Sequence, residues 1–350
     1  MLPPDVPAPP PSFPPPPPAY AAPAPVLSEP VWTNASATAA APEVVEAVPF
    51  HRLNIARGRP PRWWRPLLTA LLAFGFYIAG VVLFAIPLGI AAAVDPVIAE
   101  RIMSMADAAN VDMTDPLTFT VAMGSIILML PALLFASRIV AGRGVGLLSS
   151  VAGRLRWGWL LRSLAASAAV FVLANGLLMA IAAAQGEPLI VAESQPWWML
   201  VMVLLLVPVQ CAAEEYVFRG FLMQTIGSWL RHPAFAILLP LPFFVFGHLY
   251  DVWGLLSVAT FALAAGWLTW RTGGLEAGIA LHIVNNLSVF VLAAFGLADA
   301  NADGGGALDL LFSVLIIGLS TFVIDRLWRR SGLARTRELR WPGAVPAAAE

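Results

Sequence analysis

The sequence of 350 residues is poor in charge, because only 12% of its residues are Asp, Glu, Lys or Arg while 59% are hydrophobic. A soluble domain carries about 25% charged residues, so this composition argues against a soluble protein and predicts an integral membrane protein. Lysine is absent, and all 20 basic residues are arginine. The formal net charge of −1 provides no overall positive field that would attract nucleic acid.

Cysteine is nearly absent as well. The single Cys211 excludes an internal disulfide and any metal or redox motif that needs two cysteines, and we expect it to be a small apolar packing residue. The HExxH motif of helical zinc proteases is missing. The first residues lack the basic and apolar regions of a signal peptide, so none is predicted there.

Two terminal tails and a basic segment flank the apolar part of the chain. Residues 1–48 are rich in Pro and Ala without an apolar period, which predicts a disordered or polyproline-like tail. Residues 49–65 include five arginines together with Trp63 and Trp64, a composition typical of a juxtamembrane segment at the lipid interface. Residues 331–350 are predicted to be a cytoplasmic C-terminal tail.

The intervening residues 66–330 contain apolar segments near the ~20 residues that cross a bilayer. They lie at about 66–94, 117–140, 158–184, 197–223, 234–250, 252–271, 275–297 and 307–328. The fifth is short and contains Pro240 and Pro242, which predict a bend. The predicted fold class is therefore all-α: a polytopic transmembrane helical bundle of about eight spans.

The loops between these segments alternate in charge. Arginines gather before the first segment, after the second and after the last, whereas the intervening loops carry mostly Asp and Glu. Positive charge stays in the cytoplasm, so we expect both termini to be cytoplasmic. The abundance of Ala, Pro and Gly with arginine as the sole basic residue suggests a bacterial inner membrane.

Three polar motifs lie inside these apolar segments, where ionisable groups are costly and tend to mark function. They are Glu214-Glu215-x-x-x-Arg219, Phe244-x-x-x-His248 and His282-x-x-x-Asn286. Helix positions four apart share a face, so Glu215 is expected to pair with Arg219 and to leave Glu214 free. A free carboxylate in an apolar site suits a general base. The alternative is that all three charges form one structural ion network.

These groups match the needs of peptide hydrolysis. Glu214, assisted by His248, could deprotonate a water, and His282 and Asn286 could donate hydrogen bonds to the developing oxyanion. Alternatively, Glu214, His248 and His282 could bind Zn²⁺ with an open fourth position. Counting about 1.5 Å per residue places His282 about 10 Å and His248 about 20 Å from the arginine-bearing side, with Glu214 deeper if its segment runs on to Arg231. If these groups meet, either the segment bounds differ by several residues, or helix tilt and the bend at Pro240 and Pro242 bring them to one level.

The three motif stretches resemble those of the CPBP family, which comprises type II CAAX prenyl endopeptidases and bacteriocin-processing or self-immunity proteins. The resemblance covers roughly residues 197–297, with the motifs in the family's order. It implies an eight-helix intramembrane endopeptidase whose site opens toward the cytoplasm. The implied catalytic residues are Glu214, His248, His282 and Asn286, with Glu215, Arg219 and Phe244 in support.

The sequence thus predicts an endopeptidase that cleaves a membrane-associated peptide or protein within the lipid bilayer, without a nucleic-acid partner. One alternative is a proton-coupled transporter in which the acids and histidines form a relay; internal repeats or acids on many spans would favour it, and neither is seen. Another is a non-catalytic immunity or scaffold protein, which the loss of a motif residue would favour, but every motif residue is present.

Overall fold

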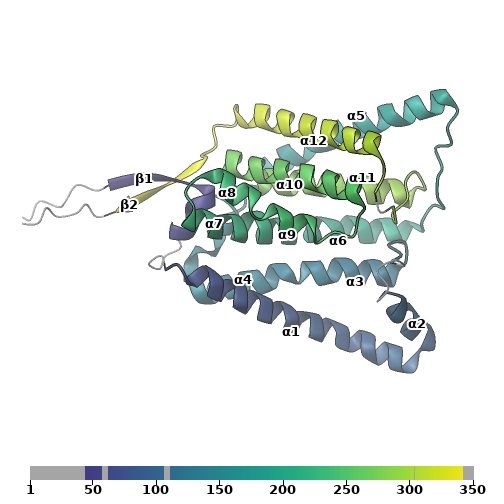
Figure 1. The fold of residues 1–350 in the computed structure, drawn as a ribbon, viewed down its shortest axis with the longest axis horizontal. Coiled ribbons are helices and arrows are strands. Elements are labelled where there is room, and N and C mark those ends of the chain that lie inside the picture. The colour runs from purple at the N-terminus through teal and green to yellow at the C-terminus, as the bar shows by residue number, and fades with distance from the viewer. Residues whose placement is uncertain (1–43, 57–61, 106–110, 303, 342–350) are drawn as a thin grey trace, which may run out of the picture. The chain divides into compact units, whose positions relative to one another are not determined.

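The computed structural model describes residues 44–56, 62–105, 111–302 and 304–341, which are mostly helical, 74%, with almost no sheet (Figure 1). Within this part of the chain, seven helices are long and apolar enough to cross a membrane. The predicted class, a polytopic helical bundle, is confirmed. Most of the Pro/Ala-rich tail, residues 1–43, lies outside the described residues.

The helices follow the predicted apolar segments closely. Their bounds are α1 Arg65–Val94, α2 Pro96–Ser104, α3 Pro116–Ile127, α4 Met129–Ala141, α5 Trp157–Gln185, α6 Trp197–Glu215, α7 Met223–Trp229, α8 Pro233–Leu238, α9 Leu241–Val245, α10 Val252–Thr272, α11 Glu276–Ala294 and α12 Ala307–Trp328. A π-helical segment, η4 Tyr216–Leu222, joins α6 to α7 in one apolar span. Two 3-10 segments are η1 Phe50–Ala56 and η3 Gly142–Leu148.

The bundle has two chemically different ends. At one end, which we call the arginine-rich end, Arg156 before α5 meets the start of α11 at Glu276 and the end of α10 at Thr272. At the other, the acid-rich end, Asn301 Nδ2 donates to Asp112 Oδ1 at 2.9 Å between two loops that are distant in sequence. The loop before α5, with Arg156, and the loops that hold Asp112 and Asn301 thus lie at opposite ends of the bundle.

The predicted fifth segment crosses the bundle without a long helix. It starts at the arginine-rich end, where the His51 ring contacts the carbonyl of Arg231 at 3.1 Å. It ends at the acid-rich end, where Gly304 packs against Asp251. Between them lie only α8 and α9, because Pro240 lacks the amide hydrogen that would continue the helix. The bend predicted from the prolines is present, and this crossing is made of two short helices.

The inner ends of both terminal segments are structured, and for residues 44–48 this differs from the disorder predicted for residues 1–48. Strand β1 Val44–Pro49 pairs antiparallel with β2 Thr336–Trp341 (Figure 1). Behind β1, the side chains of Phe50 and Leu53 are fully buried in a cluster that includes Met223 of α7. Val48 of β1 is buried in the same cluster, and burial of these apolar side chains explains the order of the strand.

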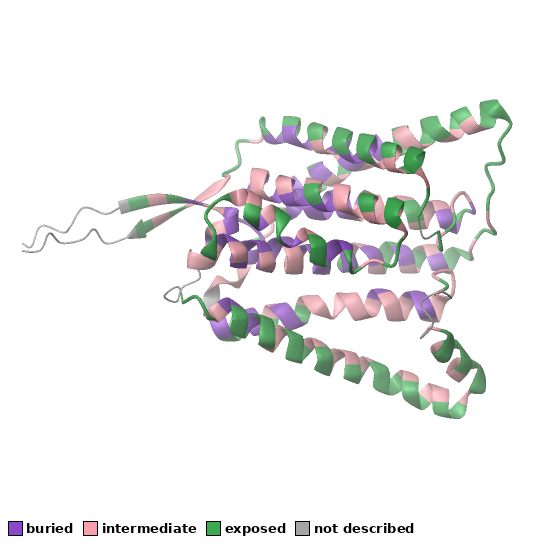
Figure 2. Cartoon of the chain, in the orientation of Figure 1, coloured by how far each residue is buried: buried purple, intermediate pink, exposed green. Residues whose placement is uncertain are grey.

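Helix α11 lies at the centre of the bundle and contacts α5, α6 and α10. Half of its apolar window is buried, 50%, against 6% for α1, whose sides are mostly exposed (Figure 2). In a membrane, exposed apolar side chains face lipid, so α1 is a peripheral helix and α11 a core helix. Polar groups on α11 are therefore shielded from lipid by its neighbours.

Candidate active site

Glu215 is the hub of a buried polar network between α6 and α11. Its Oε1 accepts a hydrogen bond from Arg219 Nη1 at 2.8 Å and lies 3.0 Å from His282 Nδ1. The side chain of Glu215 is fully buried, and those of Arg219 and His282 are nearly so. The pair between Glu215 and Arg219 predicted from their spacing is present, but its link to His282 was not predicted.

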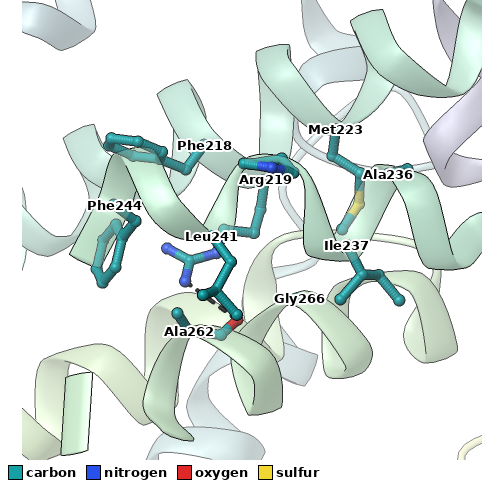
Figure 3. A pocket seen from close by; sticks show the side chains of 10 residues that line it. Phe218, Arg219, Met223, Ala236, Ile237, Leu241, Phe244, Ala262 and Gly266 are labelled. Carbon is teal, nitrogen blue, oxygen red and sulfur yellow. Dashed lines mark hydrogen bonds between the residues drawn. The ribbon is translucent and has the colours of Figure 1, made fainter. Parts of the chain in front are cut away.

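Arg219 is satisfied on several sides, as a cation inside a membrane bundle must be. Its Nη2 donates to the Ala262 carbonyl at 3.2 Å, and the guanidinium lies 4.2 Å from the centre of the Phe244 ring. Figure 3 shows this side chain at the wall of a small cavity between η4, α8, α9 and α10. The cavity of about 10 Å³ has room for about one water molecule.

Glu214 lies beside this network without belonging to the Arg219 pair. Its Oε2 is buried, lies 3.5 Å from His282 Nε2 and accepts no hydrogen bond from the described residues. The distance is long for a direct hydrogen bond. Each of the two adjacent glutamates keeps one buried oxygen without a partner among the described residues, but Glu215 balances a cation, whereas the unpartnered Oε2 of Glu214 faces an imidazole.

His248 and His282 contact the same aromatic ring. The Phe244 ring centre lies 5.0 Å from that of His248 and 6.0 Å from that of His282. His248 Nδ1 lies 2.8 Å from the Phe244 carbonyl, so Nδ1 carries the hydrogen and Nε2 of the neutral ring is left as an acceptor. Among the described residues, no hydrogen bond or ion pair joins His248 to Glu214; the structure brings His282 next to Glu214 instead.

Asn286 lies one turn beyond His282 on α11. Its Nδ2 is 3.5 Å from Gln210 Oε1, and Asn285 Nδ2 donates to Asn286 Oδ1 at 3.2 Å. Cys211 is fully buried and packs with Val207 and other apolar side chains, and its Sγ also donates to Gln210 Oε1 at 3.4 Å. Asn286 is only partly buried.

The segment η4 explains why the first glutamate motif and His282 meet. Gly220 in η4 packs against Leu275, since a Cβ at Gly220 would lie 3.5 Å from Leu275 Cδ1. Glu214 is about one and a half turns before Gly220, and His282 is about two turns after Leu275, so both lie at similar depth. The larger depth predicted for Glu214 is wrong, because α7 runs past this level and packs on η1.

The zinc alternative can be compared with this arrangement. In the described part of the chain, no three His, Cys, Asp or Glu side chains gather where they could hold a metal ion. The set Glu214, His248 and His282 is therefore not assembled as zinc ligands, and we derive no step through a metal.

A second buried ion pair was missed by the sequence analysis. Glu276, at the start of α11, is fully buried, and its Oε2 lies 2.7 Å from Arg156 Nη2. Arg156 Nε and its backbone amide also donate to Glu276 Oε1, at 2.9 and 2.8 Å. The two residues are 120 positions apart, so no local pattern could reveal the pair. It joins α5 to α11 at the arginine-rich end.

Together, the fold and the site define an integral membrane protein with a glutamate–histidine centre buried among its helices. Comparison with known proteins agrees, because residues 194–288 match a family model described as type II CAAX prenyl endopeptidase Rce1-like. The resemblance predicted from the three motifs is thereby confirmed over the residues that contain them.

A curated relative is the uncharacterized protein YyaK of Bacillus subtilis (strain 168), 32% identical over 124 residues. The aligned part covers 33% of this chain and 40% of the relative, so the chain spans well under half of the relative that it matches. No solved structure gives a significant match.

Proposed function

We propose that this chain is an intramembrane endopeptidase that hydrolyses a peptide bond of a membrane-associated substrate with a water activated by Glu214. One observation carries the proposal. Glu214 Oε2 is buried beside His282 Nε2, at 3.5 Å, and accepts no hydrogen bond from the described residues. The match of residues 194–288 to an Rce1-like endopeptidase family supports the same reaction.

In this mechanism Glu214 accepts a proton from the attacking water while the water oxygen bonds to the substrate carbonyl carbon. The proton then passes from Glu214 to the leaving amine as the carbon–nitrogen bond breaks. His282 is held at Nδ1 by Glu215, which leaves its Nε2 facing Glu214 and the water. A carboxylate that fixes the imidazole in this way sets its tautomer and orientation.

Two further groups complete the site. The amide of Asn286 is proposed to donate to the oxyanion, because such donors stabilise the charge that develops on the carbonyl oxygen. His248 presents Nε2 as a free acceptor, since Nδ1 is bonded to the Phe244 carbonyl. We propose that His248, which contacts the same Phe244 ring as His282, holds the water or the substrate amide.

The protein is proposed to reside in a bacterial inner membrane with its arginine-rich end in the cytoplasm. Both β1 and β2, which adjoin the two termini of the described chain, lie at this end together with η1. Positive residues remain on the cytoplasmic side of a membrane. The site lies a few helical turns from this end, so a substrate segment close to the cytoplasmic surface would reach it.

The test compares membrane proteomes of cells that express the wild type, Glu214→Gln or Glu187→Gln. Glu187 is an exposed carboxylate in the loop after α5 and provides the matched control. We expect C-terminal peptides produced by cleavage of a membrane protein in cells with the wild type and in cells with Glu187→Gln. Cells with Glu214→Gln at equal abundance should yield none. Equal cleavage by all three would refute the proposed base, and no cleavage by any would favour a non-catalytic membrane protein.

A further inference from the structure

The outer face of α12 combines an apolar stripe with two arginines. Leu315, Leu319, Phe322, Arg326 and Arg329 follow one another at spacings of four and three, so they share one face of the helix. Leu315, Leu319 and Phe322 are 61%, 51% and 58% exposed, and the Arg329 side chain is 59% exposed. The stripe therefore runs along the lipid-facing side of α12 and ends in positive charge at the arginine-rich end. Figure 2 shows that much of the outer surface of α12 is exposed.

The positive charge at the end of this stripe exceeds the negative charge near it. Asp325 accepts from Arg271 Nε at 2.8 Å and from Arg329 Nε at 2.7 Å, so one carboxylate serves two arginines. The Arg326 guanidinium folds over the Phe322 ring at 5.5 Å. No acidic side chain of the described residues lies within ion-pair distance of Arg326, so this end of α12 can accept an anion.

The segment that follows α12 adds a further cation, Arg335, whose position is fixed by its contacts. The Arg335 guanidinium lies 4.3 Å over the Trp270 ring, and its pKa is lowered by partial burial and by the charge of Arg271. The backbone before it is anchored, because Arg156 Nη1 donates to the Ala334 carbonyl at 3.2 Å. Like charges held close together in this way would be stabilised by an anion at the surface.

We propose that this face of α12 binds one anionic phospholipid, with its phosphate on Arg326 and Arg329 and an acyl chain along Phe322, Leu319 and Leu315. The phosphate matches the unbalanced positive charge, because guanidinium groups bind phosphate oxygens in pairs. The apolar stripe continues directly from the arginines into the membrane, which suits an amphiphile and not a free anion or an acidic peptide. This proposal does not depend on the peptidase function.

The experiment is native mass spectrometry of the purified full chain, titrated with phosphatidylglycerol or with phosphatidylcholine. The test variant is Arg326→Ala with Arg329→Ala. The matched control, Arg138→Ala with Arg162→Ala, removes two exposed arginines of α4 and α5 toward the same end of the bundle. An arginine near an anionic surface contributes about fivefold in affinity, so the double variant is expected to bind phosphatidylglycerol about thirtyfold more weakly.

The expected result is a preference of the wild type and of the control for phosphatidylglycerol, lost in the test variant while its elution volume in detergent stays that of the wild type. Absence of the preference in the wild type, or its retention in the test variant, would overturn the proposal. Inorganic phosphate in millimolar excess provides the last arm. Failure of phosphate to displace the lipid supports the role of the apolar stripe, and full displacement contradicts it.

Discussion

Replacing Glu215 by Gln tests how much the negative charge of this side chain contributes to the buried network. Glu215 Oε1 lies within hydrogen-bond distance of Arg219 Nη1 and His282 Nδ1, whereas its Oε2 has no partner among the described residues. An amide oxygen in the place of Oε1 keeps the acceptor and the shape. The substitution therefore removes the negative charge that balances a buried cation, with little change in packing.

The magnitude follows from the geometry of the pair. Two unit charges about 4 Å apart attract by about 4 kcal/mol at an effective dielectric constant of about 20, and a broken buried pair costs about 3–5 kcal/mol. Arg219 retains its bond to the Ala262 carbonyl and its contact with the Phe244 ring. We therefore expect a loss near the lower end of this range, about 3 kcal/mol.

The assay is membrane abundance together with thermal denaturation in detergent. Glu215→Gln should lower both the abundance and the melting temperature. Adding Arg219→Met should restore part of each loss, because the buried cation is then gone. Glu276→Gln, which breaks the pair with Arg156 away from the site, is the control for a buried pair. It should lower stability but keep activity per folded molecule, whereas Glu215→Gln should also lower kcat by releasing His282. A double variant no more stable than Glu215→Gln would refute this reasoning.

Three further outcomes are expected. Asn286→Ala should reduce kcat by about 10²–10³, the usual effect of losing one oxyanion donor, and unchanged kcat would remove Asn286 from the mechanism. Peptidase activity should survive strong chelators, with less than one zinc per purified chain; one bound zinc that is lost in His282→Ala would restore the zinc alternative. Reporter fusions after Asp107 and after Glu350 should report a periplasmic and a cytoplasmic location, and the reverse pattern would invert the proposed topology.

The helices could be predicted from the sequence because each is a long apolar run, and the lipid requires every backbone group within such a run to be bonded internally. The ion pair between Glu215 and Arg219 could also be predicted from the sequence, since helical spacing alone places the two side chains together. The short crossing made by α8 and α9 was signalled by Pro240 and Pro242, which break the helical hydrogen-bond pattern.

Contacts between distant segments could not be predicted. The ion pair of Arg156 and Glu276, the contact of Glu215 with His282 and the pairing of β1 with β2 depend on which helices become neighbours. The depth of Glu214 was misjudged for the same reason, because residue counting assumes that every span ends at the same plane. In the structure, α7 extends to η1 beyond the level where α11 begins.

The π-helical segment η4 has a consequence for the chain's tolerance of length changes. A π turn accommodates one residue more than the α turn it replaces, so η4 acts as an inserted residue between two correctly phased stretches. Before it, Glu215 points to α11; after it, Gln224 donates to the Leu147 carbonyl in η3 at 2.7 Å. Deleting a single residue of η4 would rotate α7 by about 100° relative to α6. One of these two anchorages would then be lost, even though every polar motif residue outside η4 remained in place.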